Sequence, residues 1–484
     1  MLICESNAQQ STPAYHDLYQ QLMRATHTSI HSASPMSAPT STLQQREQAI
    51  RFLRQQLQQA GEMTSDLPCD ISGLTAWSDA HVSKVGQGYQ AYLQRRQAGG
   101  PREFFDNRSH ALFYLQAIAP TKLVDGAWLY GLTRYWQDER FYPLIKTYIE
   151  ELGEGQAQQN HVMLYTKLLE RHGCVSDQIA TDPLYLQGAI QLALGHYCEE
   201  FLPEIVGYNL GYEQPPLHML ITAYELQELG IDPYYFTVHI TTDNASTGHA
   251  RQAVDAVQRL APAIGSTAEF YARVKAGYQL NALGPDSCAL LASFDLYQQT
   301  VTMLENKRFY GLNMHSDRCR LAGKTINQWL QTSGQMDAFL NTLVKTGWVK
   351  RGADPQQSRF WQLIGAENAK MAGVFSSYEA QLIYDWIADG WSGTSVAPLP
   401  TAALLASNAR AKVLDSTPSS MPAPELPHQA PGDPGFAAHQ LQQELQRLPM
   451  NAKMERLIEL MAPHLHSTEA GLLATRMYWK QLCR

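Results

Sequence analysis

Residues 234–250 read YYFTVHITTDNASTGHA and place His239, Asp243 and His249 within eleven residues. On a helix His239 and Asp243 would lie on one face, about one turn apart, where they could bind the same metal ion. His249 lies about 120° away from Asp243 on an ideal helix, so it joins them only where the chain is bulged or bent, which Gly248 favours. The stretch therefore predicts a metal site, and the alternative is an ordinary helix with two surface or capped histidines.

The rest of the chain predicts an all-α fold. Between residues 101 and 395, amphipathic blocks of helical period are separated by breaks such as Gly99-Gly100-Pro101 and Asp232-Pro233. Strands and helices do not alternate, which argues against a doubly wound sheet. We expect the following division: a flexible N-terminal tail at 1–42, a helical domain at 43–300, an appended helical region packed on it at 301–396, a Pro/Ala-rich linker at 397–436 and a C-terminal helical segment at 437–484.

Composition excludes several classes of partner. Charged residues make up 17% of the 484 residues and the formal net charge is −8, so the sequence carries no electrostatic footprint for nucleic acid. The seven cysteines are scattered and never form C-x-x-C, which is typical of reduced thiols in a cytosol. No apolar run approaches the roughly 18 residues of a membrane span. We therefore expect a cytoplasmic protein with no membrane and no nucleic-acid partner.

Common catalytic motifs are missing from the sequence. H-E-x-x-H, G-x-S-x-G and G-x-G-x-x-G do not occur, which removes the usual zinc-protease, serine-hydrolase and dinucleotide signatures. Gly323-Lys324-Thr325 is similar to the end of a phosphate-binding loop, but Arg318 stands where the loop requires a glycine. We interpret these three residues as helix surface.

The first candidate partner segment for a metal is 148–169, YIEELGEGQAQQNHVMLYTKLL. His161 begins an apolar helical run there. Glu154 precedes His161 by seven residues and shares its face on a straight helix, whereas Glu151, ten residues before, needs a bulge near Gly153-Glu154-Gly155. Either acid can be the ligand, and the alternative is that both belong to a solvated first turn.

The second segment is 196–213, HYCEEFLPEIVGYNLGYE, where Glu204 stands among apolar residues. A carboxylate in such surroundings costs several kcal/mol unless it is paired or bound to metal, which makes Glu204 a candidate ligand. The candidates together offer three carboxylates, three imidazoles and no thiolate. This set suits iron or manganese better than structural zinc and is large enough for two ions.

The ordered set resembles the haem-oxygenase-like di-iron oxidases, known as iron-containing redox enzymes. Their pattern has a Glu and a His on one core helix, a Glu on a second, and His-x-x-x-Asp-x-x-His on a third. Over roughly residues 105–260, Glu151 with His161 resembles the first element, Glu204 the second, and His239 with Asp243 the third.

Two positions depart from that pattern. His249 follows Asp243 by six residues rather than three, and Ser246 stands where the family places its histidine. The motif EELGEG resembles family members that use the acid before Leu-Gly, which favours Glu151, while straight-helix geometry favours Glu154. The first-helix ligand therefore stays open between these two acids.

The resemblance implies a haem-oxygenase-like helical bundle with appended C-terminal helices, which binds no haem and holds two iron ions per chain, with manganese as an alternative. It also implies a dioxygen-dependent oxidase or oxygenase that performs N-oxygenation, desaturation or oxidative C–C cleavage on an amine, amino acid or fatty acid. Electrons would come from an external donor or from the substrate, and a homodimer is compatible with the family. The alternative is a metal-free or mono-metal helical binding or scaffold protein.

Overall fold

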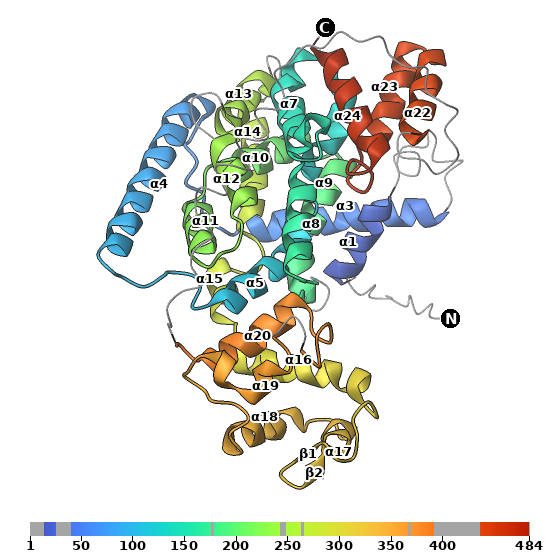
Figure 1. The fold of residues 1–484 in the computed structure, drawn as a ribbon. Coiled ribbons are helices and arrows are strands. Elements are labelled where there is room, and N and C mark those ends of the chain that lie inside the picture. The colour runs from blue at the N-terminus through green and yellow to red at the C-terminus, as the bar shows by residue number, and fades with distance from the viewer. Residues whose placement is uncertain are drawn as a thin grey trace, which may run out of the picture.

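The structure is a computed structural model that describes residues 14–25, 40–175, 179–242, 248–262, 266–365, 369–391 and 436–483. Within these ranges it is built almost entirely of helices (Figure 1), and its only strands form one two-stranded hairpin. The predicted all-α, haem-oxygenase-like bundle is confirmed. None of the described helices has both the length and the apolar character that a membrane crossing requires.

The central bundle holds the larger of two hydrophobic cores. Its helices are α5 (Arg108–Ala117), α6 (Ala119–Lys122), the 3-10 helix η2 (Ala127–Tyr135), α7 (Tyr142–Glu151), α8 (His161–Arg171), α9 (Leu186–His196), α10 (Leu202–Tyr212), α11 (Leu217–Glu228), α12 (Tyr234–Thr242), α13 (His249–Leu260) and α14 (Thr267–Gln279). Helices α9 and α10 are buried along most of their length because they carry almost no charged residues. Gly207 on α10 and Gly277 on α14 let these two backbones approach each other so closely that a Cβ at either glycine would meet the backbone of the other helix.

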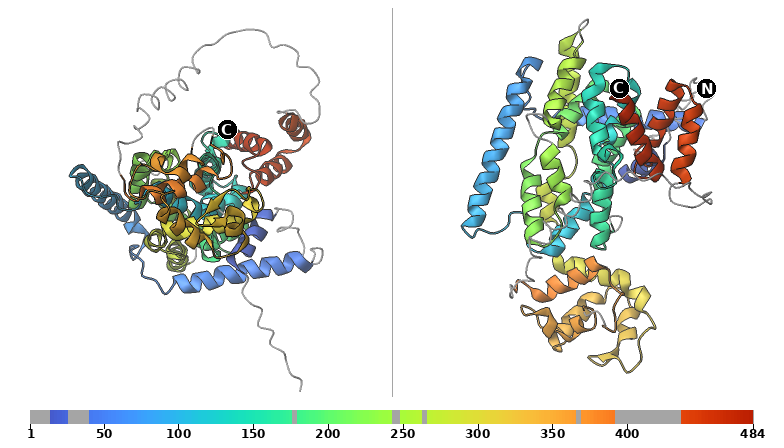
Figure 2. Two further views of the ribbon diagram at one scale, coloured as in Figure 1. Left: turned by 60° about the horizontal axis from the view of Figure 1, so that its bottom comes forward. Right: turned by 45° about the horizontal axis from the view of Figure 1, so that its top comes forward.

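The N-terminal helices wrap the outside of this bundle (Figure 2). They are α1 (Tyr15–Arg24), α3 (Thr40–Ala60) and α4 (Leu74–Gln97), and α4 contacts α11 and α13. Helix α1 lies inside the segment for which we expected a flexible tail. Its residues Leu18 and Leu22, one turn apart on one face, are buried against α9, so residues 15–24 differ from that expectation. Much of the remainder of 1–42 lies outside the described residues.

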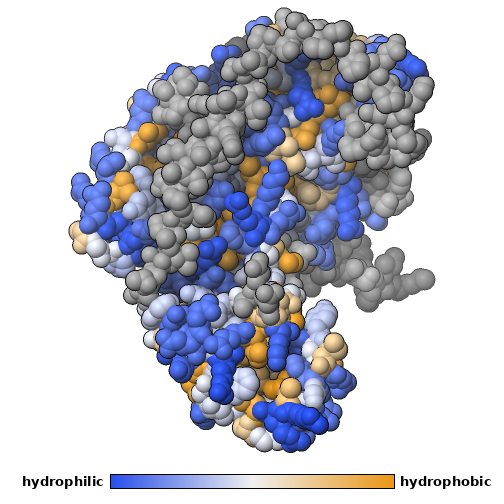
Figure 3. Space-filling view, in the orientation of Figure 1, coloured by the Kyte–Doolittle hydropathy of each residue, from blue (hydrophilic) through white to orange (hydrophobic). Residues whose placement is uncertain are grey.

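A second hydrophobic core joins the lobe at the bottom of Figure 1 to the central bundle, because it includes residues of α5, α8, α11 and α12 as well as residues of the lobe. The elements of this lobe are α15 (Ser287–Ala292), α16 (Leu296–Gly311), β1 (Arg320–Leu321), β2 (Lys324–Thr325), α17 (Ile326–Gln331), α18 (Met336–Lys345), α19 (Arg359–Gln362) and α20 (Ser377–Ala388). Helix α16 runs across the expected boundary at residue 300, and Ser109 at the start of α5 binds Asp385 of α20 through its backbone N–H and its hydroxyl. Figure 3 shows apolar surface on this lobe between hydrophilic side chains.

The interpretation of Gly323-Lys324-Thr325 as helix surface is wrong. Leu321 pairs with Lys324 in the antiparallel hairpin, and the two residues between them, Ala322 and Gly323, have φ angles of 47° and 82°. Two consecutive positive φ angles are typical of the tight turns that join two-residue hairpins, and they cannot continue a helix.

The described part of the C-terminal segment is helical. Its helices are α22 (Phe436–Arg447), α23 (Met450–Leu460) and α24 (Glu469–Leu482). They pack on the central bundle, and α24 contacts the 3-10 turn η4 (Gly153–Gly155) between α7 and α8. Nearly all of the expected linker at 397–436 lies outside the described residues.

Candidate metal centre

Two groups of buried carboxylates and imidazoles meet inside the bundle. The first group is Asp125, Glu151, His161 and His239, and the second is Glu151, Glu213 and His249. Within each group the candidate donor atoms all lie within 4.8 Å of one another, and every member is at most 5% exposed. Because Glu151 belongs to both groups, the two form one continuous cluster.

A break in the chain brings Glu151 and His161 together. Helix α7 ends at Glu151, and Gly153, Glu154 and Gly155 follow with φ angles of 63°, 51° and 78°. Helix α8 begins at His161, and the side chain of Asn160 caps it by accepting from the backbone N–H of Met163. The bulge that Glu151 requires near these glycines is therefore present.

Glu151 and His161 fit a shared cation. Glu151 Oε2 and His161 Nδ1 are 2.5 Å apart, yet neither atom has a hydrogen-bond partner of acceptable geometry. Burial alone would raise the pKa of Glu151, but the adjacent His161 outweighs this effect and the pKa is lowered. Two buried donor atoms this close to each other are suited to bind the same positive ion.

Glu154 lies elsewhere. The straight helix that would align it with His161 does not exist, because the left-handed residues 153–155 separate α7 from α8. Among the described residues Glu154 belongs to neither group, whereas Glu151 belongs to both. The geometry therefore favours Glu151 over Glu154.

Asp125 is a member of the first group that was not predicted from the sequence. This residue follows α6. The next residue, Gly126, has a φ of 81°, and a Cβ at this position would collide with the side chain of Glu151. The hydroxyls of Tyr212 and Tyr235 donate to the two oxygens of Asp125 at 2.8 and 2.5 Å. Burial opposes ionisation, but Lys122 and the nearby imidazoles hold the pKa of Asp125 well below its usual value. Its apolar sequence neighbours in KLVDGAWL, residues 122–129, were a signal that could have revealed it.

His239 presents one nitrogen to the cluster. Its Nδ1 lies 2.7 Å from the backbone carbonyl of Tyr235, which can only accept a hydrogen bond, so Nδ1 carries the proton. Its Nε2 lies 3.2 Å from Asp125 Oδ2 and is the nitrogen available to a metal. Asp243, the predicted partner of His239, lies outside the described residues.

His249 joins the cluster as the first residue of α13. Helix α12 ends at Thr242 and residues 243–247 are outside the described part of the chain. His249 Nδ1 lies 3.0 Å from Glu213 Oε2 and 3.6 Å from Glu151 Oε1, and its Nε2 lies 3.1 Å from Glu150 Oε2. Burial alone would raise the pKa of Glu150, but His249 and Lys146 lower it. Glu150 is therefore an anion, and its carboxylate orients the imidazole of His249.

The structure places Glu204 outside both groups. Its two carboxylate oxygens accept from Arg273 Nε and Nη2, each at 2.6 Å, in a bidentate pair. The apolar surroundings did require a partner for this buried acid, and the partner is an arginine on α14. Glu213, which follows α10 directly, is the acid of this segment that reaches the cluster, and no sequence signal distinguished it.

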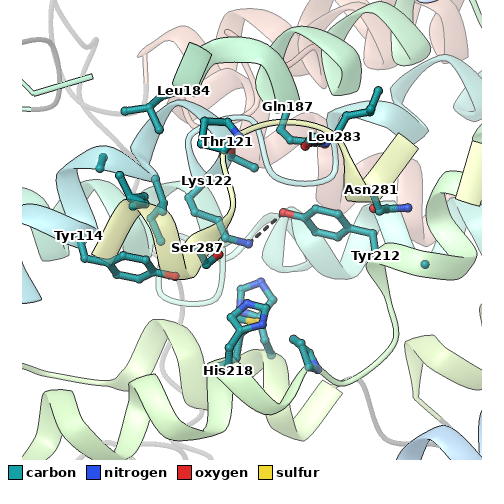
Figure 4. Close-up of a pocket in the computed structure, with 18 of the residues that line it drawn as sticks. Tyr114, Thr121, Lys122, Leu184, Gln187, Tyr212, His218, Asn281, Leu283 and Ser287 are labelled. Atoms are coloured by element: carbon teal, nitrogen blue, oxygen red, sulfur yellow. Dashed lines mark hydrogen bonds between the residues drawn. The ribbon is translucent and has the colours of Figure 1, made fainter. Parts of the chain in front are cut away.

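A cavity of about 310 Å³ opens beside the cluster. Glu151, Glu213 and His239 form part of its wall, together with residues of α6, α11 and the chain around residues 281–290 (Figure 4). A small organic molecule in this cavity would therefore touch the carboxylate and imidazole groups directly.

The fold and the site together define a haem-oxygenase-like helical bundle with a buried carboxylate and histidine cluster that could hold metal. Residues 112–282 match the family model described as "iron-containing redox enzyme", which confirms the resemblance and extends it beyond residue 260. The matched range includes every member of the cluster. No curated protein and no solved structure matches the chain.

Proposed function

We propose that the protein is an iron-dependent oxidoreductase that uses dioxygen to oxidise a small organic substrate. The observation that carries this proposal is the pair of buried groups that share Glu151, inside the segment that matches the family of iron-containing redox enzymes. Two iron ions per chain fit the two groups, with manganese as the alternative. Asp243 remains a proposed additional ligand, and Glu213 replaces Glu204 in the proposed set.

The donor chemistry supports iron. The cluster contains carboxylates and imidazoles and no thiolate, a combination that suits iron and manganese rather than soft-metal or structural zinc sites. When bound, iron would supply the activation of dioxygen that no side chain can provide.

The protein's own residues hold this set in one arrangement. The Tyr235 carbonyl fixes the tautomer of His239, the Glu150 carboxylate binds the far nitrogen of His249, and two tyrosine hydroxyls hold Asp125. Such outer contacts orient metal ligands, and their loss typically weakens metal affinity by about 10- to 100-fold.

The cavity supports a small-molecule substrate. Its walls combine apolar side chains with many polar and ionisable ones, so a small organic molecule would find both apolar contacts and hydrogen-bond partners there. N-oxygenation, desaturation and oxidative C–C cleavage all remain within the proposal, and the electrons come from an external donor or from the substrate.

The test is an anaerobic titration of the metal-free full-length chain with ferrous iron, followed by metal analysis and by measurement of oxygen consumption with amines, amino acids and fatty acids. We expect close to two irons per chain and substrate-dependent oxygen consumption. His161→Ala should lower the iron content, because His161 contributes one of the facing donor atoms. A stoichiometry near zero would reject the enzyme, and one near unity would support a mono-metal site instead.

A further inference from the structure

Lys122, the last residue of α6, places the only lysine or arginine side chain in the described wall of the cavity. Its Nζ donates to the hydroxyl of Tyr212 at 2.9 Å and lies 5.0 Å from the centre of that ring. The nearest carboxylate oxygen is Asp125 Oδ2, 4.0 Å away, and the Lys122 side chain is 14% exposed. An ammonium held this far inside the protein has lost most of its water and gains from an anion.

Asp125, behind the wall, forms one long ion pair with Lys122 at 4.0 Å, and no carboxylate of the described wall lies closer to this ammonium. Glu151, Glu213 and His239 belong to the proposed metal centre, and Asp125 behind them is held by two tyrosine hydroxyls and by His239. An ammonium has three N–H groups, and among the described residues the hydrogen bond to Tyr212 occupies one of them. Lys122 therefore has donors left for a molecule in the cavity.

Polar side chains face the same space. The side-chain ends of Tyr114, Ser287, Lys122 and Tyr212 point toward one another across the cavity in Figure 4. Helix α11 begins at Leu217 beside this wall, and the positive end of its dipole favours negative charge there. The apolar part of the wall comes from Ile118, Leu184, Met219 and Leu290.

We propose that the cavity binds a small organic acid whose carboxylate rests on Lys122 Nζ and whose apolar body lies along the side chains of Ile118, Met219 and Leu290. This inference rests on the proposed function, because it names the substrate class of the same site. An amine would meet a like charge at Lys122. A phosphate would need more donors than one ammonium and two hydroxyls offer, since phosphate sites commonly use arginine forks or several backbone N–H groups.

The arrangement also fixes the orientation of the acid. Lys122 Nζ lies 4.0 Å from Asp125 Oδ2, a member of the first group of the metal centre. The carboxylate end of the bound molecule therefore lies nearest the centre, and its apolar end points away.

The test uses hexanoate, hexanol and hexylamine as probes of equal chain length, with the full-length chain both metal-free and loaded anaerobically with ferrous iron. Calorimetry or equilibrium dialysis gives the dissociation constants. We expect hexanoate to bind at least about tenfold more tightly than either of the other probes, in keeping with a charge-assisted hydrogen bond. Lys122→Met should remove this preference and Lys122→Arg should keep it. Lys345→Met, which removes an exposed lysine of α18, should change nothing.

If Lys122→Met fails to fold, a second variant and the NMR spectrum of the wild-type chain test the same proposal. Leu290→Trp fills the cavity from α15 without touching Lys122 and should weaken hexanoate binding at least about tenfold. In the wild-type chain with 15N-labelled lysine, hexanoate should shift one Nζ resonance. Unchanged hexanoate affinity in Lys122→Met or in Leu290→Trp would overturn the inference.

The two proposals can fail separately. A chain that binds iron but holds hexanoate independently of Lys122 would keep the proposed function and lose the organic-acid substrate. A chain that takes up no iron, yet binds hexanoate through Lys122 in the metal-free state, would lose the enzyme and keep the anion site.

Discussion

Glu204 and Glu213 lie nine residues apart and have the same side chain, yet they bind different partners. Glu204 lies in the first turn of α10 and pairs with Arg273, whereas Glu213 follows the last turn and lies 3.0 Å from His249 Nδ1. Both carboxylates are nearly inaccessible to solvent. Burial therefore shows that each needs a partner, and only the position of the neighbouring helix decides which partner it meets.

The two acids give a matched pair of variants. We expect Glu213→Gln to lower the bound iron toward one ion per chain, because a neutral amide is a poor metal ligand. We expect Glu204→Gln to keep the iron content of the wild type and to reduce the free energy of unfolding by about 1.5–3 kcal/mol, the usual contribution of a hydrogen bond to a charged group. Metal analysis and urea unfolding of both variants check this. Loss of iron in Glu204→Gln with full retention in Glu213→Gln would reverse the assignment.

At the scale of elements, the turn η4 sets the geometry of the centre. It separates α7 from α8 by three left-handed residues, and α24 covers it, with Arg476 donating to the carbonyl of Gly155. A Cβ on Gly155 would collide with the backbone carbonyl of Leu472 and with the side chain of Arg476. The glycine is needed both for its φ of 78° and for the close approach of α24.

Gly155→Ala should therefore reduce the free energy of unfolding by more than about 1 kcal/mol and weaken iron binding, because the turn that carries Glu151 must shift. Gly86→Ala is the matched control. Gly86 lies inside helix α4, where an added Cβ meets nothing within 4 Å, so alanine should stabilise the protein by about 0.4–1 kcal/mol. Chemical unfolding and iron titration measure both effects. Equal stability of the two variants would show that the turn tolerates a side chain.

At the scale of the whole molecule, a segment far along the chain closes over the centre. The Tyr148 hydroxyl donates to the carbonyl of Met461, and the Asn160 amide Nδ2 lies 3.0 Å from His466 Nδ1. The amide nitrogen can only donate, so His466 Nδ1 must be unprotonated to accept. Residues 436–483 thus dock onto the turn and helix that position Glu151 and His161.

This docking should be sensitive to acid. Burial, with a smaller contribution from His464, lowers the pKa of His466 from an ordinary value of 6.5 to about 4. Between pH 4 and pH 6.5, His466 is therefore protonated more readily in the unfolded chain than in the folded protein. The stabilisation is complete above pH 6.5 and is lost as the pH falls toward 4, by an amount on the order of 3 kcal/mol. We expect His466→Gln to show a smaller loss of unfolding free energy between pH 7.5 and 5 than the wild type, both measured without metal. An identical pH dependence would show that His466 is not the responsible group.

The sequence by itself determined the local properties of the chain. These are the helical period, the pattern of apolar residues and the presence of residue types that can bind a metal. They predicted the all-α fold and a candidate metal set that includes Glu151, His161, His239 and His249, while the choice between Glu151 and Glu154 and the role of His249 stayed open. The flexible tail was expected over 1–42, yet residues 15–24 form a helix that packs on the bundle. Residues 323–325 were expected on a helix and instead belong to a hairpin. Short segments such as these take their conformation partly from what they pack against or from a turn.

Only the tertiary structure decided which acids complete the cluster. Asp125 and Glu213 reach it from other elements of the bundle, while Glu204, which sequence reasoning favoured, faces Arg273. The physical reason is that burial makes every carboxylate seek a positive partner, and a metal and a guanidinium satisfy it equally well. The choice between a metal and a guanidinium depends on which helices pack together. The spacing of residues along the sequence does not predict which side chains lie close together across the bundle.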